Sequence, residues 1–423
     1  MDKKQYDTYL HILKKELIPA MGCTEPIAIA FAAAKARELL GKMPTAITML
    51  CSGNIIKNVK GVVVPNSGGY KGVEAAALLG CLAGRPELEL EVIRDVTPEK
   101  QDLLRHYLKE EPICLCKLAE GEENLFIRAE MTDGKNSVAV EIRTRHNHIS
   151  RLEKNGEIIF QEETSSEAAV SKEKESLHIA DILEFANEVA ISDIEEIIGR
   201  QISYNAAISE EGLLHAWGSQ IGKTILALDP SGTRSRAKAA AAAGSDARMN
   251  GCPLPVVINS GSGNQGITCT MPVVIYAEEW QVSKEQLYRA LVAANLISLH
   301  QKRYIGNLSA YCGAVSAGAA AACGIAYLRG ESYDVIGKTL VNTLANVGGI
   351  ICDGAKASCA AKISTAVDAG IFGYEMARRE LTFPFGEGIV EQDYEKTIQN
   401  IGRVGRVGMR STDIEVLNIM VGN

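Results

Sequence analysis

Two cysteines with a lysine between them form the densest group of reactive side chains in the chain. Cys352 and Cys359 are separated by six residues, and Lys356 lies between them. An Asp-Gly pair predicts a tight turn, and the Ala-rich sequence from residue 355 predicts a helix, so both thiols can face one point. Thiolates suit iron–sulfur clusters, zinc and Cu(I). Packing in a core is the competing interpretation, because free cysteines are among the most buried residues.

A third cysteine, Cys23, comes directly before a long Ala-rich helix that is predicted to reach about Leu40, with Pro26 at its first position. A helix N-terminus carries partial positive charge and free N–H groups, which lower a thiol pKa and attract a carboxylate. Thr24 is therefore either a simple N-cap or part of a carboxylate site.

Two glycine-rich loops have the composition of small-anion sites. The first contains Asn66, Ser67 and Gly68 and precedes a helix predicted over residues 73–82. The second, residues 259–266, matches G-x-G-x-x-G. A dinucleotide site needs a helix after the glycines, whereas the β-branched, proline-containing sequence that follows predicts extended chain. We therefore interpret the second loop as a cradle for a carboxylate, with donors from Asn259, Ser260, Ser262 and Asn264.

The elements that position these residues divide into two predicted domains. Residues 1–170 have an α+β pattern, in which residues 46–52 and 59–66 are expected as strands. Residues 171–423 are helical in pattern, except for residues 245–278, which are expected to be strand-like or extended around the glycine loop. The polar residues 161–176 lie between the two patterns and are expected to form a linker.

Composition excludes several classes of protein. A formal net charge of −8 gives no reason to expect nucleic acid or an anionic membrane as a partner. Eleven cysteines in 423 residues, with no visible signal peptide, indicate a reducing, cytoplasmic location rather than a disulfide framework. The uncharged residues 304–328 are rich in Gly and Ala, so we expect a buried helix there rather than a membrane span. Abundant small residues on helices suggest a homodimer.

Six motifs occur in order along almost the whole chain: GCTEP (22–26), PNSGG (65–69), SDARMNG (245–251), NSGSGNQGI (259–267), IGNLSAYCGAV (305–315) and CDGAKASCAAK (352–362). Together they resemble the L-cysteine desulfidase family of the serine dehydratase-like superfamily. The resemblance implies an oxygen-sensitive [4Fe–4S] enzyme that converts the small amino acid L-cysteine to pyruvate, ammonia and sulfide without pyridoxal phosphate.

The resemblance also implies roles for individual cysteines. The related iron–sulfur L-serine dehydratases hold their cluster with three cysteines of the helical domain, whose positions fall here on Cys312, Cys352 and Cys359. The spacing of the last two is shorter here than in those dehydratases. The expected architecture is thus an α+β N-terminal domain followed by a mostly all-α, cluster-binding domain. Where the dehydratases carry a Ser-Ser-Ser-His-Thr loop, this chain has Cys23, as a fourth ligand or an acid–base group.

Elimination of sulfide needs a base for the Cα proton and stabilisation of the departing sulfur. Cys23 and Lys356 are the candidate bases, and the two glycine-rich loops are the candidate carboxylate sites. Dehydration of L-serine on the same scaffold remains open, because sequence alone does not separate hydroxyl from thiol at an iron. A non-catalytic thiol or iron–sulfur redox sensor is the alternative from another class.

Overall fold

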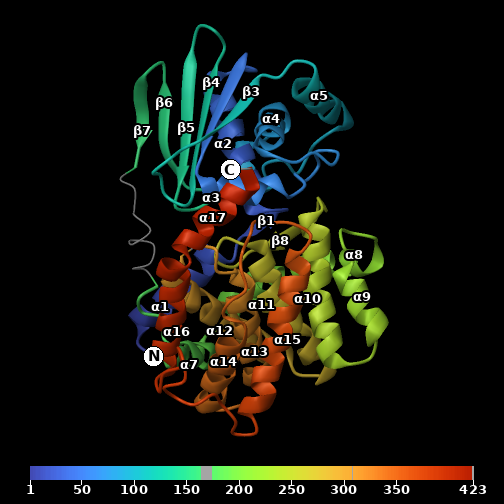
Figure 1. The fold of residues 1–423 in the computed structure, drawn as a ribbon, viewed down its shortest axis with the longest axis vertical. Helices are drawn as coiled ribbons and strands as arrows, with labels where there is room; N and C mark the ends of the chain where they lie inside the picture. Colours follow the sequence, from blue (N-terminus) through green and yellow to red (C-terminus); the bar gives the residue numbers. More distant parts are fainter. Residues whose placement is uncertain (163–173, 307, 422–423) are drawn as a thin grey trace.

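The computed structural model describes residues 1–162, 174–306 and 308–421. Figure 1 shows an α/β part at the top of the view and a helical part below it. The predicted succession of an α/β region and a largely helical region is confirmed. Most of the expected linker, residues 163–173, lies outside the described residues.

The α/β part is built on a six-stranded sheet with strand order β3-β2-β4-β5-β6-β7. Only the β2–β3 pair is parallel, and the other neighbours are antiparallel. One face packs against α2 (Thr24–Leu40) and α4 (Val73–Ala83), whose buried alanines allow close approach. The strands are β2 (Ala46–Cys51), β3 (Cys114–Leu118), β4 (Phe126–Thr132), β5 (Ser137–Arg143), β6 (Ile149–Lys154) and β7 (Glu157–Gln161).

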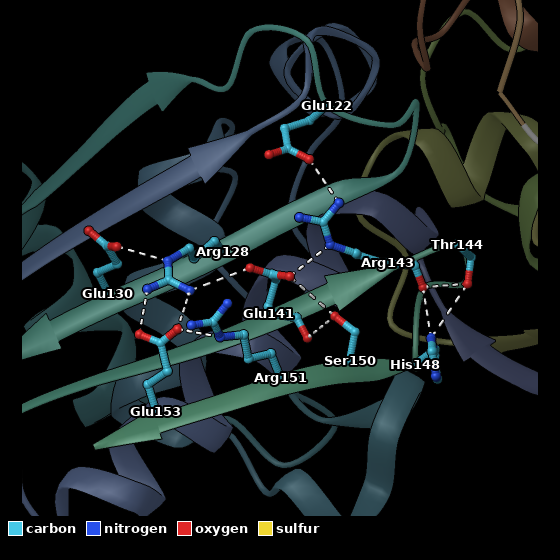
Figure 2. Close-up of polar contacts among 10 residues, drawn as sticks. All are labelled: Glu122, Arg128, Glu130, Glu141, Arg143, Thr144, His148, Ser150, Arg151 and Glu153. Carbon is cyan, nitrogen blue, oxygen red and sulfur yellow. Dashed lines mark hydrogen bonds and ion pairs between the residues drawn. The ribbon is translucent and has the colours of Figure 1, made fainter. Parts of the chain in front are cut away.

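The opposite face of this sheet carries a network of ion pairs between strands (Figure 2). Arg128 on β4 contacts Glu153 on β6 at 2.8 Å, and Glu141 on β5 lies between Arg128 and Arg143. Of these pairs, Arg128–Glu141 joins neighbouring antiparallel strands, and such a pair of opposite charges contributes roughly 0.2–1 kcal/mol. The alternation of apolar and charged residues thus gives this sheet one face for the helices and one polar face.

The helical part packs around α10 (Thr233–Met249), α11 (Gly263–Glu279), α13 (Gly313–Leu328) and α15 (Cys359–Ala377). Small residues bring these helices together: a Cβ on Gly318 would lie 2.7 Å from the backbone of Ala366. The surrounding helices are α7 (Ile179–Glu188), α8 (Ile191–Leu214), α9 (Ile221–Leu228), α12 (Lys284–Ile305), α14 (Tyr333–Val347) and α16 (Tyr394–Arg403).

Each end of the chain packs against the part to which the neighbouring sequence does not belong. The N-terminal α1 (Lys3–Glu16) packs on the helical part, where Tyr9 contacts Phe185 edge-to-face. The short β1 (Pro19–Met21) pairs with β8 (Pro255–Val257). At the other end, α17 (Arg410–Val421) reaches α3 (Gly53–Lys60) of the α/β part, as Figure 1 shows. The α/β part and the helical part therefore meet along one boundary, which we call the seam.

Two predicted strands are wrong. Residues 59–66 form no strand, because α3 occupies residues 53–60 and irregular chain follows, with a single bridge from Val63 to Lys71. Residues 245–278 are expected to be strand-like or extended, but only Pro255–Val257 form a strand there. Residues 245–249 end α10, and Gly263–Glu279 form a helix although Pro272 lies inside it. This helix is buried along most of its length, so tertiary packing outweighs the low helix propensity of its β-branched residues. Within the described residues, no helix is long and apolar enough to span a bilayer.

Candidate functional site

A cavity between the two parts is lined by about half of the predicted site residues. Its volume is about 100 Å³, well below the roughly 300–1,000 Å³ of pockets that bind drug-sized ligands. Helices α2 and α3 form one wall, while α10, α11, α13 and the turn before α15 form the other. The cavity is therefore of a size for a small metabolite.

Four helices point their N-termini at this cavity. Cys23 is the N-cap of α2, Ser262 of α11 and Cys312 of α13, and Cys359 is the first residue of α15. All four residues line the cavity. Each helix end presents free N–H groups and partial positive charge. Four such ends favour a bound carboxylate, whereas burial raises the pKa of the thiols of Cys23, Cys312 and Cys359 that stand at three of them.

Three cysteines of the helical part, Cys312, Cys352 and Cys359, line the same wall of the cavity. A backbone bridge between Tyr311 and Ile351, with a 3.0 Å bond from the Cys312 amide to the Ile350 carbonyl, sets Cys312 beside Cys352. The interaction with the Cys312 thiol outweighs burial and lowers the pKa of Cys352 below its usual value. The same interaction and burial raise the pKa of Cys312.

The chemistry of these donors fits an iron–sulfur cluster. Cys312, Cys352 and Cys359 supply sulfur only, and thiolates are the usual ligands of [4Fe–4S] clusters. In the described part of the chain, no three His, Cys, Asp or Glu side chains converge closely enough to hold a single metal ion. Three thiols spread over one wall suit a cluster with several irons better than a zinc site.

Cys23 and Glu25 form a buried hydrogen-bonded pair at the same cavity. The Cys23 thiol donates to Oε2 of Glu25 at 2.8 Å, and Asn58 Nδ2 donates to Oε1 at 3.0 Å. Burial and the negative charge of Glu25 raise the pKa of Cys23 well above its usual value. Burial alone would raise the pKa of Glu25, but its contacts with His146 and Cys23 hold it below its usual value. The pair therefore consists of a thiol and a carboxylate.

Arg248 is a buried cation that points into the cavity. Its exposed fraction is 2%, and Nη1 donates to Oδ1 of Asn264 at 3.0 Å, while Nε has no partner. Among the described residues, no carboxylate forms an ion pair with it. A Cβ on Gly263 would lie 2.4 Å from Nε, so the glycine makes room for the guanidinium. A buried cation needs a counter-ion, and the planar guanidinium matches a carboxylate.

Further polar groups complete the lining. Lys57 reaches the cavity from α3 and forms an ion pair with Asp413 of α17. The Tyr311 hydroxyl and Oε1 of Gln265 also lie at the cavity and are buried without hydrogen-bond partners. Unsatisfied buried polar atoms cost stability and indicate a place for a ligand or water.

Six of the predicted site residues line the cavity: Cys23, Ser262, Asn264, Cys312, Cys352 and Cys359. Two more, Thr24 and Ser260, are buried behind the lining; the Thr24 hydroxyl donates to the Gly261 carbonyl at 2.8 Å.

The other predicted residues do not line the cavity. Asn259 is held in a buried amide network with Asn295 and Ser298. Lys356 is ion-paired with Asp353. Three residues of the first loop pack elsewhere: Asn66 donates to backbone carbonyls of residues 93 and 94, the Ser67 hydroxyl donates to the Tyr70 carbonyl, and Gly68 is outside the cavity.

Sequence reasoning missed the charged residues of the cavity. The sequence did contain a sign of Arg248, because this arginine follows an Ala-rich segment and lies inside the SDARMNG motif. Glu25 lies within GCTEP, beside the residue that was singled out. Lys57 and Tyr311 carry no local signal, since only the tertiary fold brings them to the cavity.

Comparisons with known proteins identify the family of this chain. The profile of the family described as serine dehydratase alpha chain matches residues 87–418. A protein of Finegoldia magna is 51% identical over 414 residues, which covers 98% of this chain and 99% of the relative. A protein of Desulfitobacterium hafniense is 50% identical and covers 99% of this chain and 97% of the relative. Both carry the name UPF0597 protein, which states no activity. The chain belongs to the serine dehydratase alpha-chain family.

Proposed function

We propose that this protein is an iron–sulfur-dependent lyase that cleaves L-cysteine to pyruvate, ammonia and hydrogen sulfide by α,β-elimination. The observation that carries the proposal is the placement of three thiols and an arginine without a carboxylate partner around one small cavity. Membership of the serine dehydratase alpha-chain family supports elimination chemistry on an amino acid. A redox sensor has no need of a buried carboxylate site beside its thiols.

Cys312, Cys352 and Cys359 would hold a [4Fe–4S] cluster; Cys312 stands at the N-terminus of α13 and Cys359 at that of α15. When bound, the cluster would supply a Lewis-acidic iron with an open position for the β-substituent of the substrate. The protein itself performs the remaining tasks, which are to bind the carboxylate, to exclude water and to accept the Cα proton.

Arg248 binds the substrate carboxylate in this proposal. The free Nε and the remaining N–H groups of the guanidinium form a fork that matches two carboxylate oxygens. Asn264 fixes the orientation of the fork from the N-terminus of α11. A carboxylate bound there neutralises a buried charge, and the partial positive charge of α11 adds to its attraction.

Cys23 accepts the Cα proton in this proposal. The side chain lines the cavity opposite the helical wall, and its own proton can pass to Glu25, 2.8 Å away. Loss of the Cα proton and of the β-sulfur leaves aminoacrylate, which tautomerises and takes up water to give pyruvate and ammonia. Lys356 is the weaker candidate, because it is paired with Asp353 outside the cavity lining.

The decisive experiment measures iron, acid-labile sulfide and product formation on anaerobically purified protein, with L-cysteine and L-serine as parallel substrates. We expect iron and sulfide near four per chain, and sulfide and pyruvate released in equal amounts from L-cysteine. Faster pyruvate formation from L-serine would replace the desulfidase by the dehydratase that the family description names. Iron without turnover of either substrate would favour the sensor.

A further inference from the structure

A thiol can act as a base only if its own proton has somewhere to go. Cys23 is held as a thiol, with its proton directed at Oε2 of Glu25. Glu25 is buried, with 7% of its surface exposed, and its contacts hold its pKa below the usual value, so it is a poor place to keep a proton that it receives. The proposed role of Cys23 therefore requires a further proton acceptor next to Glu25.

His146 stands on the far side of Glu25 from Cys23. It lies between β5 and β6 of the α/β part, and its Nε2 is 3.9 Å from Oε1 of Glu25. This nitrogen is buried and has no hydrogen-bond partner. Burial also lowers the pKa of His146, and an unprotonated imidazole nitrogen can accept a proton. Proton transfer from Glu25 to His146 therefore needs a side-chain movement that closes this 3.9 Å gap.

Behind His146 lies a second, smaller cavity of about 30 Å³. Its wall contains charged side chains at the seam, among which Glu16 pairs with Arg145 at 2.8 Å. Gly261, with φ +73°, also lines it and lets the glycine loop approach the imidazole, since a Cβ there would lie 3.2 Å from Cε1 of His146. The imidazole thus borders this second cavity and lies 3.9 Å from Glu25, which lines the main cavity.

We propose that His146 is the terminal proton acceptor of a Cys23–Glu25–His146 relay and exchanges that proton through the second cavity. This inference rests on the proposed function for its role in turnover. As the Cα–H bond breaks, its electron pair forms the Cα=Cβ bond and the β-sulfur leaves with the Cβ–S pair. Cys23 takes the Cα proton while its own proton moves to Glu25 and then to Nε2 of His146. No oxidant or reductant is needed.

His148 offers a matched control in the same hairpin, because its Nε2 pairs with Glu162 at 2.7 Å, away from the cavity. The first measurement uses cluster-free protein, in which mass spectrometry follows the alkylation of Cys23 by iodoacetamide between pH 6 and 9. With Glu25 unable to pass the proton on to His146, Cys23 in H146Q should react at least about tenfold more slowly at pH 7, and H148Q should match the wild type. Equal Cys23 rates in H146Q and wild type would overturn the relay.

The second measurement uses the loaded enzyme. We expect H146Q to retain its iron but to lose at least about tenfold in kcat for L-cysteine, and H146G to regain activity when imidazole is added. The pH profile of kcat should shift, since Glu25, Arg248, Lys15, Glu16 and Arg145 surround the imidazole. If wild type itself does not turn over L-cysteine, the proposed function fails, and the alkylation rates still decide whether the relay exists.

Discussion

Nη1 of Arg248 donates a 3.0 Å hydrogen bond to Oδ1 of Asn264, which joins the last turn of α10 to the first turn of α11. The bond uses one N–H of the guanidinium and leaves Nε without a partner. Asn264 thus orients a buried cation toward the cavity without neutralising it. This relationship explains how the helical part can present a carboxylate-binding group from its own core.

Replacement of Arg248 by lysine should weaken substrate binding. Lysine keeps the positive charge but loses the two-pronged geometry, and a hydrogen bond to a charged group is worth about 1.5–3 kcal/mol. We expect KM for L-cysteine to rise about 10- to 100-fold, with a smaller change in kcat. R234K is the control, since Arg234 pairs with Asp368 away from the cavity. Equal KM values for both variants would remove Arg248 from the carboxylate site.

The cluster assignment predicts different behaviour for two cysteines of one helix. Cys312 caps α13 at the cavity, whereas Cys323 is buried later in the same helix and donates to the Ile336 carbonyl. We expect C312S to lose most of its iron and all activity, and C323S to keep both. Iron analysis and the visible absorption of anaerobic protein check this. A C312S variant with full iron content would contradict the ligand assignment.

Lys356 should prove dispensable for catalysis. Its ammonium pairs with Asp353 and donates to the Asp353 carbonyl at 3.0 Å, outside the cavity lining. We expect K356Q to keep kcat within about threefold, because general base catalysis contributes about 10²- to 10⁴-fold when a true base is removed. Steady-state kinetics test this, and a loss of 100-fold or more would restore Lys356 as the base.

Local patterns predicted much of the fold and half of the site. Ala-rich periodicity located the helices that begin near Cys23 and Cys312, and helix N-termini next to cysteines pointed to the cavity. Asn259 was misjudged because nothing local distinguishes an amide that binds a ligand from one that bonds to Asn295, 36 positions away. Lys57 and His146 were missed for the same reason, since each reaches the site only through tertiary packing.

The loop of residues 261–266 matches the G-x-G-x-x-G motif, but its glycines are needed for packing rather than for a dinucleotide. Gly261 adopts a positive φ, Gly263 gives room to Arg248, and Gly266 lies against the carbonyl of Val257. A helix does follow the glycines, contrary to the prediction, but the preceding strand β8 pairs antiparallel with β1 in a two-stranded sheet. This loop is therefore not part of the parallel βαβ unit that a dinucleotide site requires.

Gly266 should be essential for packing rather than for ligand binding. A Cβ at this position would lie 2.0 Å from the Val257 carbonyl oxygen, and backbone cannot move aside as a flexible side chain can. We expect G266A to lower the free energy of unfolding by about 1–3 kcal/mol or to prevent folding. G349A is the control, because a Cβ there meets nothing within 4 Å. Denaturant unfolding of the cluster-free proteins measures the difference.

Asp246 should make stability fall as pH rises. Burial raises the pKa of this carboxyl to about 6, although Oδ2 accepts a 3.0 Å bond from the Gly222 amide. In the unfolded chain the pKa is about 3.9, so the folded state binds more protons between pH 4 and 6. The stabilisation is complete below about pH 4 and is lost above about pH 6.

The variant D246N removes this titration. The quantity to follow is the free energy of unfolding of D246N minus that of wild type. This difference should increase by about 2–3 kcal/mol when the pH is raised from 4 to 7.5, as measured by denaturant unfolding. D229N provides the opposite sign, because hydrogen bonds from Ser235 and the Gly232 amide lower the pKa of Asp229. That variant should lose stability relative to wild type as pH rises. A wild-type to D246N difference that is constant with pH would show that Asp246 does not titrate in this range.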